Sequence, residues 1–170
     1  MKFPRRMLRP LIGVSVAAAM AVATAGTALA ASADDVDASA KKLSHSQATS
    51  RLDDAGIAVV SSGGCSDRNK SNCTSLEQVN EDSIKGAITL KKASGCALTV
   101  TGGTETGHAS GTYSHWNGYK LDFRMTSCLT SWVKNHYASI GGSKWKSASG
   151  NVYYNENNHW DVTYYNCGGC

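Results

Sequence analysis

Apolar residues recur along the first half of the chain with the spacing of amphipathic helices. Residues 43–56 are predicted to form a short helix, and residues 76–94 a longer one. Thr74 or Ser75 is placed to cap the start of the longer helix, and Gly95 to end it. These patterns put two helices ahead of the strand-rich part of the chain.

The second half alternates between apolar and polar residues, which is typical of half-buried strands. A short apolar run begins at Ile57, and an amphipathic helix is predicted over 129–140. The remaining strands are expected at 97–103, 119–125, 150–155 and 159–165. This order predicts an α+β domain in which helices pack on one face of a small antiparallel sheet.

The first thirty residues have the composition of an export signal. A basic start is followed by the apolar stretch LIGVSVAAAMAVATAG and by Ala-Leu-Ala at 28–30. We therefore expect residues 1–30 to be a signal peptide that is cut after Ala30. Residues 31–42 are expected to be a flexible linker, and residues 43–170 a single domain of a secreted protein.

Removing this leader changes the charge of the protein. The chain has 17 Lys and Arg against 13 Asp and Glu, a net charge of +4, and four of the basic residues but no acid lie in the leader. The remainder carries no net charge, so the basic balance is no argument for nucleic acid or an anionic membrane as a partner. No second hydrophobic stretch follows, and we expect a soluble monomer.

Cysteines occur only after the leader, which fits an oxidising compartment. They are Cys65, Cys73, Cys96, Cys128, Cys167 and Cys170. Proximity suggests that the first two pair with each other, and that the last two pair within the sequence CGGC. The remaining two would then close a central loop of roughly thirty residues. The alternative is that CGGC is a redox pair or a zinc knuckle.

A histidine and an aspartate frame a glycine-containing turn in the sequence YSHWNGYKLDF. His115 precedes the turn at Asn117 and Gly118, and Asp122 lies on the polar face of the strand that follows. An imidazole nitrogen and a carboxylate oxygen both bind zinc at about 2 Å. If the turn folds back, the two residues can share a metal ion. The alternative is a simple ion pair or hydrogen-bonded pair at the base of a loop.

The sequence ENNH supplies further groups for hydrolysis. His159 opens the last predicted strand as a third metal ligand, and Glu156 would lie beside the metal without binding it. Three protein ligands leave a fourth position for water, whose proton an adjacent carboxylate can take. The alternatives are a strand-end histidine and a solvated glutamate. Asp161 is a rival ligand or an acceptor that orients a histidine.

Together, H-x-x-G-x-x-x-D and E-x-x-H resemble the pattern of the zinc D-alanyl-D-alanine carboxypeptidases and dipeptidases, which share a fold with the Hedgehog signalling domain. Residues 61–165 also look like a branch of peptidoglycan-hydrolysing peptidases that are found in phages and are secreted by bacteria. The resemblance implies a disulfide-stapled fold of this kind and a zinc ion bound by His115, Asp122 and His159. It implies Glu156 as the catalytic base and a peptidoglycan stem peptide with D-residues as the substrate, in the extracellular space or at the cell wall.

The chain departs from this family at one position. Relatives often carry an arginine in the turn before the zinc loop, where it can bind an oxyanion or a substrate carboxylate, and here Thr104 and Glu105 occupy that turn. Either Arg68 or His108 supplies this contact, or the substrate is not held through a free carboxylate. Exopeptidase and endopeptidase action therefore both stay open.

Two functions of other classes compete with the peptidase. In the first, the domain is a non-catalytic module, with structural zinc or none, that binds a cell-wall glycopeptide or a protein partner. Trp116 and Tyr119 flank the expected site and would line its groove. In the second, the protein is an inhibitor or toxin held together by its disulfides.

Overall fold

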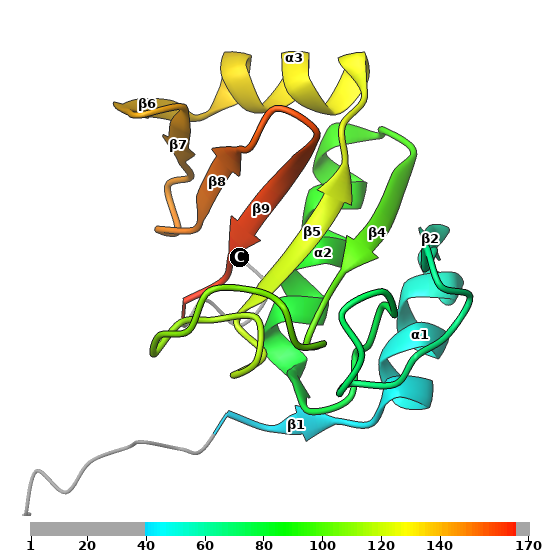
Figure 1. Ribbon diagram of the computed structural model, residues 1–170. Helices are drawn as coiled ribbons and strands as arrows, with labels where there is room; N and C mark the ends of the chain where they lie inside the picture. The colour runs from blue at the N-terminus through cyan, green and yellow to red at the C-terminus, as the bar shows by residue number, and fades with distance from the viewer. Residues whose placement is uncertain (1–39, 166–170) are drawn as a thin grey trace, which may run out of the picture. The chain divides into compact units, whose positions relative to one another are not determined.

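A seven-stranded mixed sheet organises the described part of the chain (Figure 1). The computed structural model describes residues 40–165. The strands lie in the order β2 (Ile57–Val59), β4 (Leu98–Gly102), β5 (Lys120–Arg124), β9 (His159–Thr163), β8 (Val152–Asn155), β7 (Lys144–Lys146) and β6 (Ala138–Gly141). All neighbours are antiparallel except β2 and β4. The α+β class is confirmed, but the sheet is larger than expected and mixed.

Helices α2 (Glu81–Ser94) and α3 (Ser127–His136) cover one face of this sheet (Figure 1). The indole Nε1 of Trp160, on β9, donates to Thr130 Oγ1 of α3 at 3.2 Å. A Cβ added to Gly86 of α2 would lie 2.3 Å from the ring of Tyr164, just after β9, so only glycine admits this close packing. Because side chains alternate along β9, its other residues face away from both helices.

The apolar faces of β5 and β9 form the middle of the core, as their alternation predicted. Leu121 and Phe123 of β5 are fully buried, and so are Trp160 and Val162 of β9. These four side chains point to the helix side. The intervening residues of the two strands therefore share the opposite face of the sheet.

Helix α2 begins five residues later than its apolar spacing predicts. Asn80 is its N-cap, and Gln78 just before it has a positive φ of 64°, which breaks the helical path. Leu76 and Val79 are buried but lie outside the helix, Val79 in the short strand β3 (Val79–Asn80). The helix ends at a left-handed Gly95, as expected.

The entry to the domain is a two-stranded sheet in which β1 (Lys42–Leu43) pairs with β3 (Val79–Asn80). The expected linker therefore ends before residue 42. Helix α1 (His45–Asp54) follows, with Ser44 and Gln47 forming a reciprocal capping box. The leader, its cleavage point and most of the linker lie outside the described residues.

Helix α3 is shorter than the predicted span 129–140. Tyr137 adopts an extended conformation (φ −114°, ψ 149°) and the next residues form β6, which pairs with β7. The strand at Lys144–Lys146 was not predicted. The prediction failed here because a three-residue strand has too little alternation to be recognised without its partner.

The structure forms two of the expected disulfides. Cys65 and Cys73 are joined with a Cα–Cα distance of 4.8 Å, and Cys96 and Cys128 with one of 5.9 Å. The third expected pair, Cys167 with Cys170, lies outside the described residues. Within residues 40–165, no helix is both long and apolar enough to cross a membrane.

Candidate metal centre

Two aspartates lie side by side on the face of the sheet opposite the helices. The register of β5 and β9 pairs Asp122 directly with Asp161, and both are buried. On the other side of β5, the register of β4 shifts between Val100 and Gly102, and such bulges often re-aim side chains beside functional sites. A Cβ on Gly102 would lie 2.4 Å from Asp122 Oδ2, so this glycine leaves the space that the carboxylate occupies.

The loop between β4 and β5 brings His115 to these aspartates. The turn at Asn117 and Gly118 folds back as expected, with Gly118 N donating to His115 O at 2.8 Å and a φ of 80° at the glycine. His115 is 3 % exposed, and its Nδ1 donates to Gly103 O at 2.7 Å. The remaining nitrogen, Nε2, lies 3.2 Å from Asp122 Oδ1.

Three buried polar atoms of these residues have no hydrogen-bond partner. They are His115 Nε2, Asp122 Oδ1 and Asp161 Oδ1. The first two are close, yet their geometry is not that of a hydrogen bond, and an unpaired buried polar group is costly. Donor atoms of a tetrahedral zinc site stand about 3.3 Å apart when the metal–ligand distances are near 2.0 Å. The spacing and the donor types therefore fit a metal ion.

His159, at the start of β9, approaches the same carboxylate, and Glu156 lies beside His159. His159 Nε2 lies 3.4 Å from Asp122 Oδ1 and 3.3 Å from Glu156 Oε2. The other ring nitrogen, Nδ1, donates to Asn158 Oδ1 at 2.7 Å, which leaves Nε2 to face Asp122. Asp122 thus lies close to both His115 and His159, and Glu156 is linked to them through His159. Among the described residues, however, the group of donor atoms that lie within 4.8 Å of one another does not include His159.

His108 also joins the cluster, although the sequence suggested it only as a substrate contact. Donor atoms of His108, His115 and Asp122 all lie within 4.8 Å of one another, so this group could hold a metal ion. The His108 ring stacks on that of His115, with centroids 3.8 Å apart and an interplanar angle of 17°. Nearly parallel rings direct their lone pairs alongside each other rather than toward one point.

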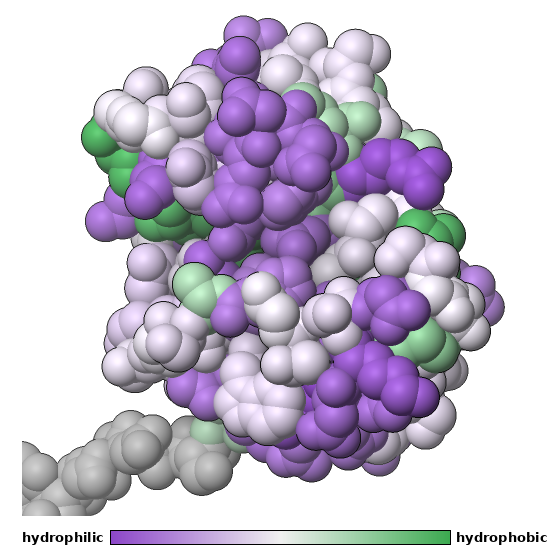
Figure 2. Space-filling view, in the orientation of Figure 1, coloured by the Kyte–Doolittle hydropathy of each residue, from purple (hydrophilic) through white to green (hydrophobic). Residues whose placement is uncertain are grey.

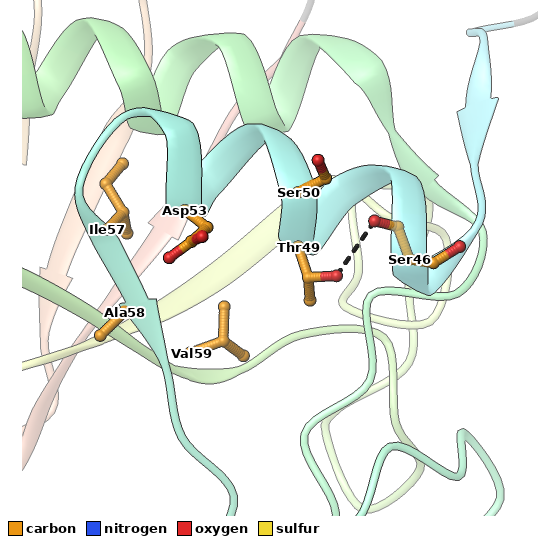
Figure 3. Close-up of a pocket in the computed structure, with 7 residues that line it drawn as sticks. All are labelled: Ser46, Thr49, Ser50, Asp53, Ile57, Ala58 and Val59. Carbon is orange, nitrogen blue, oxygen red and sulfur yellow. Dashed lines mark hydrogen bonds between the residues drawn. The ribbon is translucent and has the colours of Figure 1, made fainter.

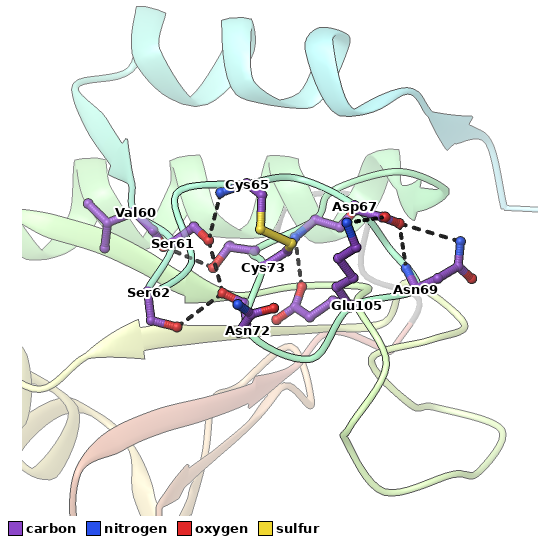
Figure 4. The surroundings of a disulfide bond; sticks show 12 residues. Val60, Ser61, Ser62, Cys65, Asp67, Asn69, Asn72, Cys73 and Glu105 are labelled. Atoms are coloured by element: carbon purple, nitrogen blue, oxygen red, sulfur yellow. Dashed lines mark hydrogen bonds and ion pairs between the residues drawn. A yellow bond between two sulfur atoms is a disulfide. The ribbon is translucent and has the colours of Figure 1, made fainter.

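A buried glutamate fixes the orientation of His108. His108 Nε2 donates to Glu105 Oε1 at 3.1 Å, while Ser75 N and Gly103 N donate to the same carboxylate at 2.7 and 3.1 Å. Burial raises the pKa of Glu105, but these hydrogen bonds outweigh it and lower the pKa below its usual value. Figure 4 shows Glu105 beside the loop that the Cys65–Cys73 disulfide closes. The turn before the His115 loop therefore holds a buried carboxylate.

One signal in the sequence could have identified this pair. Glu105 and His108 repeat the E-x-x-H spacing of Glu156 and His159. In both pairs a glutamate oxygen lies close to the histidine Nε2, at 3.1 and 3.3 Å. The two E-x-x-H segments lie on either side of Asp122, because the pairs approach it from the β4–β5 loop and from β9.

The two carboxylates beside His115 favour a positive charge on its ring. Burial lowers its pKa, but Asp122 and Asp161 outweigh burial and raise the pKa to about 9. Asp161 has a lowered pKa, because His115 and Lys120 outweigh its burial, and Lys120 Nζ lies 2.6 Å from Asp161 Oδ2. Asp161 therefore has a lysine partner, whereas the ion-pair partners of Asp122 among the described residues are all histidines.

Arg68, the other residue suggested for the missing cation, contacts the loops instead of the cluster. Its Nε donates to Thr104 O at 3.2 Å, another of its nitrogens donates to Trp116 O, and its guanidinium lies 3.7 Å from the centre of the Trp116 ring. These contacts hold the loop that contains Arg68 against the β4–β5 loop. The β4–β5 loop itself lines a groove of about 370 Å³ beside His108, in which Trp116 is 45 % exposed.

A second depression lies between α1 and the edge strand β2 (Figure 3). It is lined by Ser46, Thr49, Ser50, Asp53, Ile57, Ala58 and Val59. Thr49 Oγ1 bonds back to Ser46 O at 3.1 Å, so part of its polar lining is already satisfied within the helix. Its lining contains one acid and no histidine or cysteine, and it therefore offers no comparable set of metal donors.

The comparisons with known proteins identify no relative of this chain. No family model matches it, and neither the curated proteins nor the solved structures contain a significant match. The site must therefore be interpreted from its own residues.

Proposed function

We propose that this protein is a secreted zinc peptidase that hydrolyses D-residue-containing stem peptides of peptidoglycan. His115, Asp122 and His159 would hold the zinc ion, and Glu156 would be the general base. The observation that carries the proposal is the pair of buried atoms His115 Nε2 and Asp122 Oδ1, which lie 3.2 Å apart with no hydrogen-bond partner. His159, rather than His108, is the third ligand, because the His108 ring stacks parallel to that of His115.

The surrounding groups support this division of roles. The chemistry that zinc supplies when bound is polarisation of a peptide carbonyl and activation of water. Gly103 O and Asn158 Oδ1 each accept a hydrogen bond from the Nδ1 of one ring, which leaves the Nε2 atoms of His115 and His159 to bind the metal. Glu156 is 38 % exposed in its side chain, so it can take a proton at Oε2 and pass it to a leaving amine.

His108 lies close to the turn in which the zinc peptidases that the sequence resembles often carry an arginine. Its Nε2 is committed to Glu105, and its Nδ1, 3.9 Å from Asp122 Oδ2, faces the cluster. It also lines the groove that contains Trp116. We therefore assign the contact with the polarised substrate carbonyl to His108 and not to Arg68.

The experiment combines zinc analysis with a wall-digestion assay. We expect about one zinc per chain, and release of new amino groups from purified cell walls that a chelator abolishes. Glu156→Gln should keep the zinc and lose the release, whereas Asp54→Asn, at an exposed acid on α1, should keep both. A wild-type protein that binds zinc but releases no amino groups would refute the peptidase.

The exposed Trp116 and its groove favour a second candidate, a module that binds a wall glycopeptide without cutting it. In that case purified walls would retain the protein, and Trp116→Ala would weaken the retention. Mass analysis of the walls would then find no new termini. A peptidase predicts fragments in the same analysis.

A further inference from the structure

Positive charge is concentrated in one segment beside the candidate metal centre. Residues 123–155 contain no aspartate or glutamate, but they contain Arg124, Lys134, Lys144 and Lys146. This segment forms α3 and the strands β6, β7 and β8, which extend the sheet beyond β9. The residues after the leader have no net charge, so the excess is a local feature of this side of the domain.

Strand pairing places Lys144 on the same face as the metal centre. One row of paired residues crosses β5, β9, β8 and β7, and it runs Asp122, Asp161, Tyr154, Lys144. Residues that are directly paired in adjacent antiparallel strands project their side chains from the same face. Lys144 thus stands three strands away from Asp122, and within residues 40–165 the helices α2 and α3 lie on the opposite face.

Lys146 lies on this face as well. It pairs with Val152, which pairs with Thr163 of β9, two residues from Asp161. Trp145, between the two lysines, points to the helix side, where its ring lies 5.5 Å from that of Trp160. The alternation along β7 therefore sends both lysines to one side and the aromatic residue to the other.

These lysines are available to a ligand. Both are exposed, and among the described residues neither forms an ion pair. Lys144 Nζ lies 4.7 Å from the centre of the Tyr154 ring, which stands between it and Asp161 in the row. Figure 2 views this face and shows hydrophilic residues gathered over β8 and β9.

We propose that Lys144 and Lys146, with the Tyr154 ring between them and the metal centre, bind a carboxylate of the peptide substrate. Three strand spacings of about 4.8 Å make roughly 14 Å, which an extended peptide spans with about four residues. Asp161 and Glu156 on the same face disfavour a long polyanion and favour a ligand with a localised negative charge. The inference rests on the proposed function, because it places a peptide at the metal centre.

The test measures binding rather than turnover. The probes are fluorescent alanine peptides with a central D-Ala–D-Ala, in which the residue four positions before or after it is glutamate or glutamine. They are titrated by fluorescence anisotropy against Glu156→Gln protein, so that cleavage cannot interfere. We expect one glutamate peptide to bind about fivefold more tightly than its glutamine counterpart, and the preference to fade at about 0.5 M salt.

Lysine variants locate the effect. Lys144→Gln with Lys146→Gln should abolish the preference, whereas Lys134→Gln, in the same acid-free segment but facing Trp145 from α3, should preserve it. Equal binding of both peptides, no binding of either, or the same loss with Lys134→Gln would overturn the inference. The inference would also be overturned if the glutamate and glutamine peptides bound equally while inorganic polyphosphate bound in a way that depends on Lys144 and Lys146. A protein that prefers the acidic peptide but never cleaves walls would refute the peptidase and leave this subsite standing.

Discussion

Replacing Gly102 with alanine tests the geometry around Asp122 most directly. The new Cβ would lie 2.4 Å from Asp122 Oδ2 and 3.0 Å from its Cγ. An ordinary contact begins near 3.4 Å, so the carboxylate has to retreat by about 1 Å or rotate away. Backbone strain is not involved, because this glycine does not have a positive φ.

The expected loss follows from how little displacement a metal site tolerates. Zinc–ligand distances vary by only about 0.2 Å between good sites. A carboxylate displaced by about 1 Å no longer binds well, and we expect zinc affinity to fall by about 100-fold, or roughly 2.7 kcal/mol. The overpacking itself should lower the free energy of unfolding by about 1–3 kcal/mol.

The assay is zinc titration against a competing chromogenic chelator, combined with thermal unfolding of the metal-free protein. A double-mutant cycle supplies the control, since Asp122→Ala removes the group with which the new Cβ collides. In that background, Gly102→Ala should have little further effect on zinc affinity. Wild-type zinc affinity in Gly102→Ala, or fully additive losses in the cycle, would refute the role given to Asp122.

Three further outcomes can be measured. Removing the Cys96–Cys128 bond by a double serine substitution should lower the free energy of unfolding by about 2–4 kcal/mol, because the bond closes a separation of 32 residues; denaturant unfolding checks this, and an unchanged midpoint would contradict it. Glu81 has its pKa lowered to about 2, chiefly by hydrogen bonds from basic side chains, so its stabilisation is complete above about pH 4.5 and is lost as the pH falls toward 2. Because solvent screens these interactions, ionised Glu81 contributes about 1 kcal/mol to the free energy of unfolding, and Glu81→Gln should flatten that part of the pH–stability curve. Glu105→Gln should reduce turnover with zinc content unchanged, because it weakens the hold on His108, and loss of zinc instead would show that His108 is a ligand.

The strands of the site could be predicted because their alternation is long and unbroken. The pattern of residues 119–125 placed Asp122 opposite Leu121 and Phe123, and the structure has the same division of faces. His159 and Asp161 stand two residues apart on β9 and therefore share one face of it for the same reason. Period-two patterns of five or more residues fix which side chains share a face, whatever the rest of the chain does.

Contacts that depend on loop conformation were beyond the sequence. The E-x-x-H spacing marks Glu105 and His108 as a pair, but it does not say that His108 lies close to Asp122 on the next strand. The sequence predicts too early a start for α2, because the three-residue interval between Leu76 and Val79 also fits a helix. The positive φ of Gln78 excludes a helix there. Register between β7, β8 and β9, which carries the lysine row, depends on pairing that no local pattern encodes.

The turn that carries the His115 loop rests on the first strands of the domain. Gly118 O accepts from Asn80 N at 3.1 Å and from Ser83 Oγ at 2.8 Å, and Asn80 belongs to β3, whose partner is β1. Protein chemists who express this domain therefore need to start the fragment ahead of Lys42. A preparation that proteolysis has shortened past Lys42 would keep every donor atom of the site but lose the strand pairing that supports the turn. The mass of an inactive preparation should therefore be checked first by mass spectrometry.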